Sequence, residues 1–183
     1  MITNPSAPPG KSQKYAKADY ERRFLLSEMP AGEILRTATI TDRYLSGTRL
    51  RLRLMIEAQG DVTRTYYKLT QKISAQDGGP GLLSTIYLNL EEFSLLSTLP
   101  GSVLRKRRYS IPPFGVDVFD PPLGDLILAE CEFDDAATMR SFAPPAWIFA
   151  EVTSDPRFTG GRLATMNPRD LPKLLSAFGE SST

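Results

Sequence analysis

An alternation of arginine and leucine constrains the fold of this chain more than any other feature. The segment GTRLRLRLMIE begins at Gly47 and places Arg49, Arg51 and Arg53 at every second position, with leucines between them. Side chains of a β-strand alternate between its two faces, so the segment is predicted to be a strand with three cations on one face. Like charges in register repel each other and add nothing to folding. The pattern therefore predicts a negatively charged partner opposite the arginines.

The charges of the 183-residue chain are unevenly distributed, although the net charge is only +1. Residues 43–108 hold eleven Lys or Arg against five acids, whereas residues 109–155 hold nine acids against one Arg. A fold that brings these two segments together creates a site with both cations and carboxylates. Such a site suits a polyanion held with a metal ion better than it suits nucleic acid alone.

Composition excludes several classes of function. The chain has no histidine, which excludes Ser/His/Asp and Cys/His catalytic arrangements and a zinc site built on imidazole. The single cysteine, Cys131, excludes an internal disulfide and is predicted to pack in the core. No apolar run approaches the roughly 20 residues that span a bilayer, and no signal peptide is recognised. We therefore expect a cytoplasmic protein with no membrane partner.

The remaining sequence predicts one domain rich in antiparallel strands. Residues 1–17 are rich in Pro, Ser and Lys and are expected to form a flexible leader, with a single domain at residues 18–183. Turns are expected at residues 46–47 and 59–61, and a loop at 76–81. Strands are expected within residues 19–28, 33–47, 48–74, 82–90, 102–113, 114–119 and 126–133. Helices are expected at residues 91–101 after an Asn89 cap, at 134–142, and at 167–179 with Asn167 as cap and Gly179 as stop.

The predicted strands favour a closed barrel. Long antiparallel strands leave exposed edges unless the sheet closes, so we predict a mainly β (α+β) fold with an eight-stranded antiparallel barrel and a few helices packed outside. Arg, Lys and Glu recur on the polar faces from strand to strand. If these faces line the lumen, the barrel is a water-filled tunnel with both charge signs, and helices cover the leucine faces.

Some charged segments also have simpler interpretations, which stay open at this point. The run DYERR at residues 19–23 is also typical of a solvated edge strand with a cross-strand salt bridge. The basic strands within 48–74 are also typical of a sheet that binds nucleic acid, with Tyr66 or Tyr67 stacked on a base. The run LRKRRYSIP at residues 104–112 is also typical of a solvated basic face.

Carboxylates interrupt two otherwise apolar strands. Glu130 and Glu132 share one face of LAECEF, and Asp117 lies alone in GVDVF. Carboxylates on a buried strand are costly unless they are hydrated, paired with cations or bound to metal. These acids therefore indicate a site that contains cations, a metal ion or both.

In order along the chain, these segments resemble the motifs of the CYTH superfamily of triphosphate tunnel metalloenzymes. That superfamily includes inorganic triphosphatases, thiamine triphosphatases and class IV adenylyl cyclases. The resemblance covers roughly residues 18–165. The matching stretches are DYERR (E-x-E-x-K), RLR at 49–51 (R-x-R), LTQK at 69–72 (L-T-x-K), KRR at 106–108 (K-x-R), Asp117 (the W-E-x-D-like stretch), LAECEF at 128–133 (L-A-E-x-E) and EVTSDPRFTGGRLA at 151–164 (E-V-T-x-D-x-R-Y).

The resemblance implies a barrel whose tunnel binds a triphosphate and hydrolyses it with a divalent metal, Mg²⁺ or Mn²⁺. It implies phosphate binding by Arg23, Arg49, Arg51, Lys72, Lys106 and Arg108. It implies metal binding by Asp19, Glu21, Asp117, Glu130 and Glu132. The catalytic candidates are Glu130, Glu132 and Lys72.

The chain departs from the family pattern at three places. Asp19 replaces the first Glu of the signature, Arg23 replaces the usual Lys, and residues 82–90 lack an E-x-E pair that many members carry on that strand. Two alternatives therefore stay open, a non-catalytic module that binds polyphosphate or nucleotide and a class IV-type adenylyl cyclase. The expected partner is a small molecule that contains a triphosphate. Nucleic acid is not expected, and a homodimer is left open.

Overall fold

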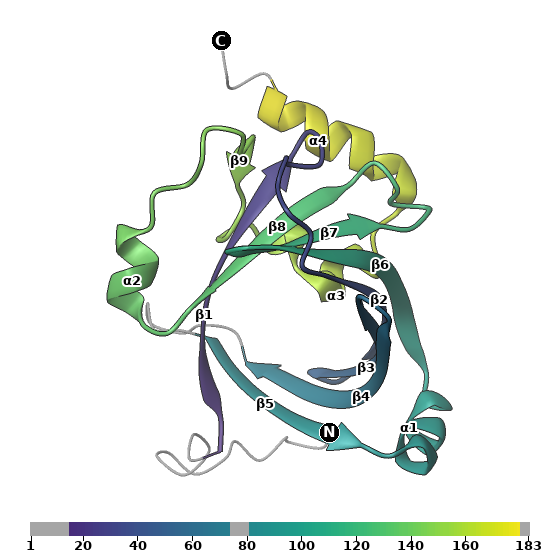
Figure 1. Ribbon diagram of the computed structural model, residues 1–183. Coiled ribbons are helices and arrows are strands. Elements are labelled where there is room, and N and C mark those ends of the chain that lie inside the picture. Colours follow the sequence, from purple (N-terminus) through teal and green to yellow (C-terminus); the bar gives the residue numbers. More distant parts are fainter. Residues whose placement is uncertain (1–14, 74–80, 180–183) are drawn as a thin grey trace.

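The computed structural model describes residues 15–73 and 81–179 and consists mainly of one antiparallel sheet (Figure 1). The strands are β1 (Lys17–Leu26), β2 (Arg36–Leu45), β3 (Leu50–Gln59), β4 (Val62–Ile73), β5 (Gly81–Leu88), β6 (Gly101–Ile111), β7 (Phe114–Phe119), β8 (Ile127–Phe133) and β9 (Ala150–Glu151). The helices are α1 (Leu90–Ser97), α2 (Ala136–Ser141), α3 (Gly160–Leu163) and α4 (Leu171–Gly179), with 3₁₀ turns η1 (Pro156–Phe158) and η2 (Pro168–Asp170).

The sheet closes on itself, which confirms the predicted eight-stranded antiparallel barrel. The strand order is β5-β4-β3-β2-β6-β7-β8-β1-β9, and β5 also pairs with β1. Closure between β1 and β5 involves only the first residues of β1, where Asp19 lies opposite Gly81. Further along β1, the same edge pairs with β9 at Phe24 and Leu25. The short strand β9 is the one addition to the barrel that the sequence did not predict.

Local sequence explains where several elements begin and end. Gly47 and Gly60 have positive φ angles of 71° and 55° in the turns β2–β3 and β3–β4, a conformation that glycine adopts without strain. Asn89 caps α1 through a capping box with Glu92, with both N–H···O distances at 2.8 Å. Asn167 caps η2, the turn before α4, and not α4 itself as predicted.

The predicted leader lies outside the described residues except for residues 15–17, of which Lys17 already belongs to β1. The loop predicted at residues 76–81 also lies outside them except for Gly81, which begins β5. No helix in the described part of the chain is long and apolar enough to cross a bilayer.

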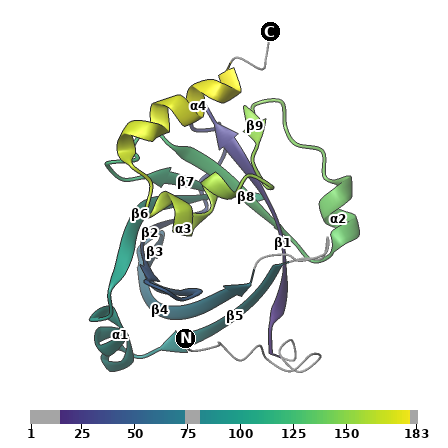
Figure 2. The ribbon, with the colours of Figure 1, turned by 180° about the vertical axis from the view of Figure 1, so that it is seen from behind.

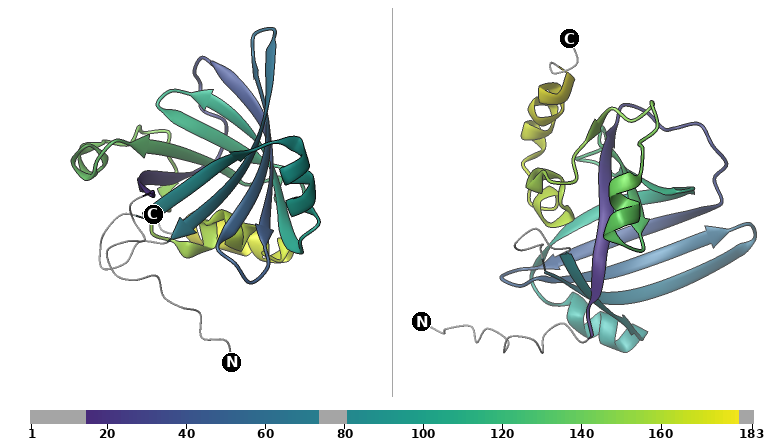
Figure 3. Two further views of the ribbon diagram at one scale, coloured as in Figure 1. Left: turned by 90° about the horizontal axis from the view of Figure 1, so that it is seen from below. Right: turned by 90° about the vertical axis from the view of Figure 1, so that its left-hand side faces the viewer.

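One hydrophobic cluster lies on the outer side of β1, β7 and β8. It contains buried Phe24, Val116 and Cys131, and Phe142 after α2 packs against it. Figure 3 shows α2 beside β1, on the outside of the barrel. The predicted core position of Cys131 is therefore confirmed. Coverage of the outer faces is incomplete, because Ile86 on β5 is 57% exposed.

A second hydrophobic cluster closes one end of the barrel. Side chains on the inner faces of four strands pack against residues that follow β9. Figure 2 shows the helices α3 and α4 at this end of the barrel. The strand members are Leu25, Leu104, Phe119 and Leu128, and the later members include Val152, Phe158, Leu163, Leu171 and Leu174. The helix α3 packs closely against Tyr44 of β2, because a Cβ added to Gly160 would lie only 1.9 Å from the Tyr44 hydroxyl oxygen. We call this cluster the apolar lid. The sequence did not predict that helices would cover an end of the barrel.

Candidate functional site

The inner face of the barrel beside the apolar lid is lined by charged side chains. Strand register places these residues opposite one another on neighbouring strands, as with Arg23 opposite Glu130 and Arg108 opposite Asp117. The solvated-edge interpretation of residues 19–23 is wrong, because β1 lies between β8 on one side and β5 and β9 on the other and Arg23 is buried. The solvated-face interpretation of residues 104–112 fails for Lys106, which is also buried.

A chain of ion pairs links six predicted site residues across β1, β8, β7 and β6. Arg23 Nε donates to Glu130 at 3.2 Å, and Arg23 also pairs with Glu21. Arg108 holds Asp117 through two bonds, from Nε at 2.7 Å and from Nη2 at 2.6 Å, and it also pairs with Glu130. Lys106 donates to the same Asp117 carboxylate. We call these residues the central ion-pair network.

Burial and neighbouring charges shift the pKa values of the network residues in opposite directions. Burial alone would raise the pKa of Glu130, but the charges of Lys106, Arg108 and Arg23 hold that pKa well below its usual range. Burial likewise opposes the charged form of Arg108, and the charges of Asp117 and Glu130 outweigh it and raise the pKa of Arg108. Glu130 therefore stays ionised and its arginine partners stay charged at neutral pH.

A second buried ion pair lies on β2 and β3. Arg53 donates to both carboxylate oxygens of Asp42, from Nε at 2.6 Å and from Nη2 at 2.8 Å. Asp42 is 1% exposed, and the charge of Arg53 lowers its pKa although burial acts to raise it. Arg51 Nε lies 3.7 Å from Asp42 Oδ1, and within the described residues it is buried without a hydrogen-bond partner. A buried donor without a hydrogen bond is unfavourable, so an anion that reached this nitrogen would be stabilised.

Sequence reasoning placed Arg53 on the same strand face as Arg49 and Arg51 but included neither Arg53 nor Asp42 among the site residues. Asp42 shares its strand face with Ala38 and Ile40, and this single acid among apolar inward positions was the signal that could have found it. Arg53 and Arg51 lie in the barrel, whereas Arg49 lies in the exposed turn before β3. Across residues 15–73 and 81–179, Arg49 forms no ion pair. The inward R-x-R pair is thus 51–53 and not 49–51.

Lys72 connects the two sides of the barrel seam, where β5 and β1 meet. Its Nζ lies 2.6 Å from Asp19 Oδ2 and 2.9 Å from Glu21 Oε1. Burial would lower the pKa of Lys72, but the charge of Glu21 and the hydrogen bond of Asp19 raise it. The two carboxylates therefore converge on one point, at which a cation already sits.

Glu132, the remaining predicted acid, lies apart from these pairs. It is exposed, it lies opposite Glu21 in the register of β1 and β8, and it has no ion pair within the described part of the chain. The described residues contain no group of three or more acidic or cysteine side chains placed to hold a metal ion. The five predicted metal ligands are thus distributed along the interior, most of them already paired with cations.

Charged residues of both signs share one cavity inside the barrel, with a volume of about 460 Å³. Its lining includes Arg53, Lys68, Arg108, Glu130 and Glu132. The inward residues of β5, the strand beside Lys68, are uncharged and lie outside this lining. Thr85 Oγ1 lies 2.9 Å from Thr70 Oγ1, and Tyr87 is the next inward position. Four cations, including Arg36, line this cavity against three carboxylates, including Glu57, and Glu130 is already paired with arginines, which suits a small polyanion.

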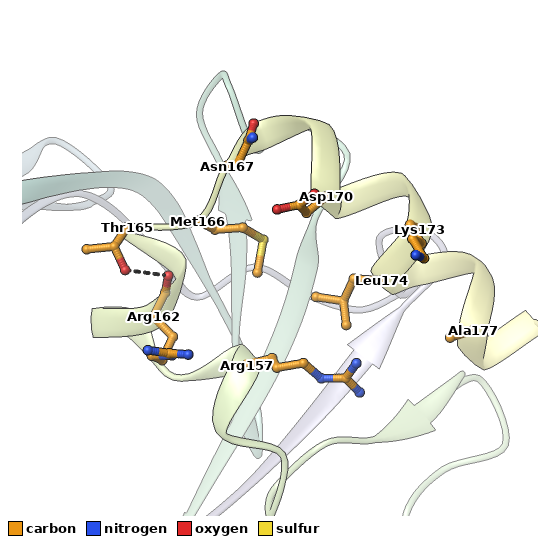
Figure 4. A pocket seen from close by; sticks show the side chains of 9 residues that line it. All are labelled: Arg157, Arg162, Thr165, Met166, Asn167, Asp170, Lys173, Leu174 and Ala177. Atoms are coloured by element: carbon orange, nitrogen blue, oxygen red, sulfur yellow. Dashed lines mark hydrogen bonds between the residues drawn. The ribbon is translucent and has the colours of Figure 1, made fainter.

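A separate cavity of about 570 Å³ lies outside the barrel, between η1, α3 and α4 (Figure 4). Arg157, Arg162 and Lys173 are part of its lining, and Leu174 lies at its base. Arg157 is paired with Asp155, with Nη2 2.6 Å from Oδ2. The apolar lid separates this cavity from the central ion-pair network, because Leu174 belongs to both the lid and the cavity wall.

Comparison with known proteins identifies close relatives in sequence and structure. No family model matches the sequence. The inorganic triphosphatase of Nitrosomonas europaea is 32% identical over 157 residues, which is 82% of this chain and 99% of that protein. The crystal structure of the inorganic triphosphatase NE1496 is 28% identical, with a TM-score of 0.53 over 83% of this chain and 97% of that one. Another crystal structure of NE1496 has the same TM-score of 0.53 over 82% of this chain and 99% of that one.

Proposed function

The chain belongs to the CYTH superfamily of triphosphate tunnel enzymes, and on that premise we propose that it is a hydrolase that cleaves inorganic triphosphate or an organic triphosphate inside its barrel. One observation carries the proposal. Five buried or partly buried cations from three strands, Arg23 of β1, Arg51 and Arg53 of β3, and Lys106 and Arg108 of β6, face one interior that an apolar lid closes at one end. A linear polyanion that enters from the other end meets charge of the opposite sign along its length.

The ion pairs of the interior prepare the cations for this substrate. Asp42 and Asp117 each hold two cations, so the guanidinium groups are already oriented before any phosphate arrives. Arginine forms forked hydrogen bonds with phosphate oxygens as well as with carboxylates. Phosphate oxygens would take the remaining donors, including Nε of Arg51, which has no hydrogen-bond partner among the described residues. The carboxylates thus act mainly as positioning residues for the cations.

The family implies a divalent cation, and the residues at the seam fit one. The ammonium of Lys72 marks a point where oxygens of Asp19 and Glu21 converge at 2.6 and 2.9 Å, which are hard ligands of the kind Mg²⁺ and Mn²⁺ prefer. Mg²⁺ usually binds one or two carboxylates and takes its other ligands from water and substrate phosphates. When bound, such an ion would offset phosphate charge and acidify a water molecule. Asp19 and Glu21 would hold it, and Lys72 would then be free to bind phosphate.

The reaction consumes one water molecule for each triphosphate. The water oxygen forms a bond to the terminal phosphorus, and the bond from that phosphorus to its bridging oxygen breaks, so that phosphate and diphosphate are released. Glu132 is the carboxylate that accepts the water proton, because no cation in the described chain pairs with it. Lys106 and Arg108 offset the charge that develops on the departing diphosphate. Glu130 is held ionised by its cations and orients them.

The test is phosphate release from tripolyphosphate, ATP and thiamine triphosphate with Mg²⁺, Mn²⁺ or a chelator. We expect release only with metal, and a loss of about 100-fold or more in the Glu130→Gln, Glu132→Gln double variant. Glu91→Gln, which makes the same chemical change on α1 outside the barrel, is the matched control. Circular dichroism shows whether each variant keeps its fold.

Each alternative function predicts a different result when binding is measured together with product release. Tight binding of tripolyphosphate without release from any substrate would indicate a binding module. Release of diphosphate from ATP without release of phosphate would indicate a cyclase. Binding of nucleic acid that needs no divalent metal and weakens steeply with salt would indicate a nucleic-acid partner and contradict the proposal.

A further inference from the structure

Two tyrosines and a lysine form a cluster on the inner faces of β4 and β5. Lys68 Nζ lies 5.3 Å from the ring centre of Tyr66 and 5.1 Å from that of Tyr87. The two rings are themselves 6.4 Å apart between centres and meet edge to face at 66°. These distances are within the range of favourable cation–π and aromatic contacts. We call these three residues the aromatic cluster.

The aromatic cluster adjoins the cationic interior. Strand register places Lys68 directly opposite Arg53 on β3 and opposite Tyr87 on β5. Lys68 and Arg53 line the same 460 Å³ cavity. From Lys68, β4 runs back through Tyr66 to exposed residues at the β3–β4 turn, so the rings lie toward the open side of the barrel. A molecule with its phosphates near Arg53 therefore has the rings at its outer end.

Lys68 differs from the other inward cations of this interior. Arg23, Arg53, Lys106 and Arg108 each form an ion pair with a carboxylate. Lys68 has no ion pair with any residue of the described chain and rests on two aromatic faces. Tyr87 is 68% exposed, an unusual degree for a large side chain whose ring is already ordered by two neighbours. The cluster thus offers an ordered, open ring and an uncompensated positive charge side by side.

We propose that the aromatic cluster is a subsite for the base of a nucleoside triphosphate whose phosphates occupy the cationic interior. This inference rests on the proposed function and extends it to a substrate class. The base stacks on the exposed ring of Tyr87, and Lys68 binds the phosphate nearest the base. A positively charged ring such as the thiazolium of thiamine is disfavoured beside Lys68 and Arg53 because like charges repel. A neutral base is favoured, and its stacking energy adds to the phosphate contacts.

The experiment measures the binding of ATP and of tripolyphosphate by calorimetry, together with phosphate release from both. The decisive quantity is the ratio of ATP affinity to tripolyphosphate affinity. We expect Tyr87→Ala to lower this ratio about tenfold, because loss of one stacked ring weakens base binding by that order. Tyr87→Phe keeps the ring and should retain the ratio. Ile86→Ala removes a large exposed side chain from the opposite face of the same strand and is the matched control.

The outcomes separate this inference from the proposed function. An unchanged ratio in Tyr87→Ala, with phosphate still released from tripolyphosphate, overturns the base subsite and leaves the hydrolase in place. A lowered ratio without phosphate release from either compound supports the subsite and contradicts hydrolysis. An equal loss of ratio in Ile86→Ala would show that the effect is not stacking and would overturn the subsite. Failure of the wild-type protein to bind either compound overturns both proposals.

Discussion

The two ends of the barrel interior differ sharply although the same strands build them. A step of two residues along a strand keeps the side chain on the inner face, and within that step the lining changes from charged to apolar. The pairs are Arg23 and Leu25 on β1, Lys106 and Leu104 on β6, Asp117 and Phe119 on β7, and Glu130 and Leu128 on β8. The boundary between the central ion-pair network and the apolar lid therefore crosses four strands at one level.

This boundary has an electrostatic consequence. Asp117 is 0% exposed and lies next to the apolar lid, so water is excluded from one side of its ion pairs. Charges interact more strongly where water is excluded, and an unpaired charge there is correspondingly unfavourable. Buried ion pairs of this kind contribute little net stability compared with apolar packing. The lid thus supplies stability, while the network supplies charge for a ligand.

Removal of Asp42 should have the largest effect on stability. Asp42→Ala leaves Arg53 and Arg51 without their shared carboxylate, and we expect a loss of about 3–5 kcal/mol in the free energy of unfolding. Asp155→Ala removes a more exposed ion pair with Arg157 and should lose about 1 kcal/mol or less. Urea titrations measure both values. Equal losses would show that burial does not distinguish the interior pair from the surface one.

Leu128 and Glu130 are neighbouring inward positions on β8, one in the apolar lid and one in the central ion-pair network. Substitutions at these positions therefore test the apolar end and the charged end of the barrel interior separately. Leu128→Ala opens a cavity in the apolar lid and should lower the free energy of unfolding by about 2–5 kcal/mol. Its kcat/KM for tripolyphosphate, measured well below the melting temperature, should fall much less than that of Glu130→Gln. If Leu128→Ala reduced kcat/KM as strongly as Glu130→Gln, the lid would have to take part in substrate binding.

Acid should weaken the ion pairs of the charged end and leave the packing of the apolar lid unchanged. We expect this effect on stability to be smaller than those of Asp42→Ala and Leu128→Ala. The pKa values of Glu130 and Asp42 are lowered in the folded state, so the stability they contribute is fully present above about pH 4 and is lost as the pH falls toward their lowered pKa values. The measurement is the free energy of unfolding from neutral pH down to about pH 3. Leu128→Ala should show the wild-type slope and Glu130→Gln a shallower one, and identical slopes in all three proteins would contradict this assignment.

The sequence predicted most of the fold because its strongest signals are local. Runs of apolar and strand-forming residues between turn signals identified the strands β1 to β8, glycines marked the β2–β3 and β3–β4 turns, and Asn89 marked the start of α1. Alternation also grouped residues by face within each strand, and the resemblance to the CYTH motifs implied that Glu21, Arg23, Lys106, Arg108 and Glu130 share one site, where they are found together. The short strand β9 and the helix α3 were missed because two and four residues are too few for a periodic pattern.

By itself, the sequence determined which side chains share a strand face and the order of the motifs on which the family resemblance rests, because both depend only on positions along the chain. Only the tertiary structure decided which of these side chains meet. It placed Arg53 against Asp42 while leaving Arg49 in a turn, joined Lys72 to β1 across the barrel seam, and packed α3 and α4 over one end. The physical reason is that strand register and barrel closure are cooperative properties of the whole sheet. A repeat of Arg-Leu-Arg fits any register shifted by two residues, and closure selects the one that buries the lid and pairs the charges.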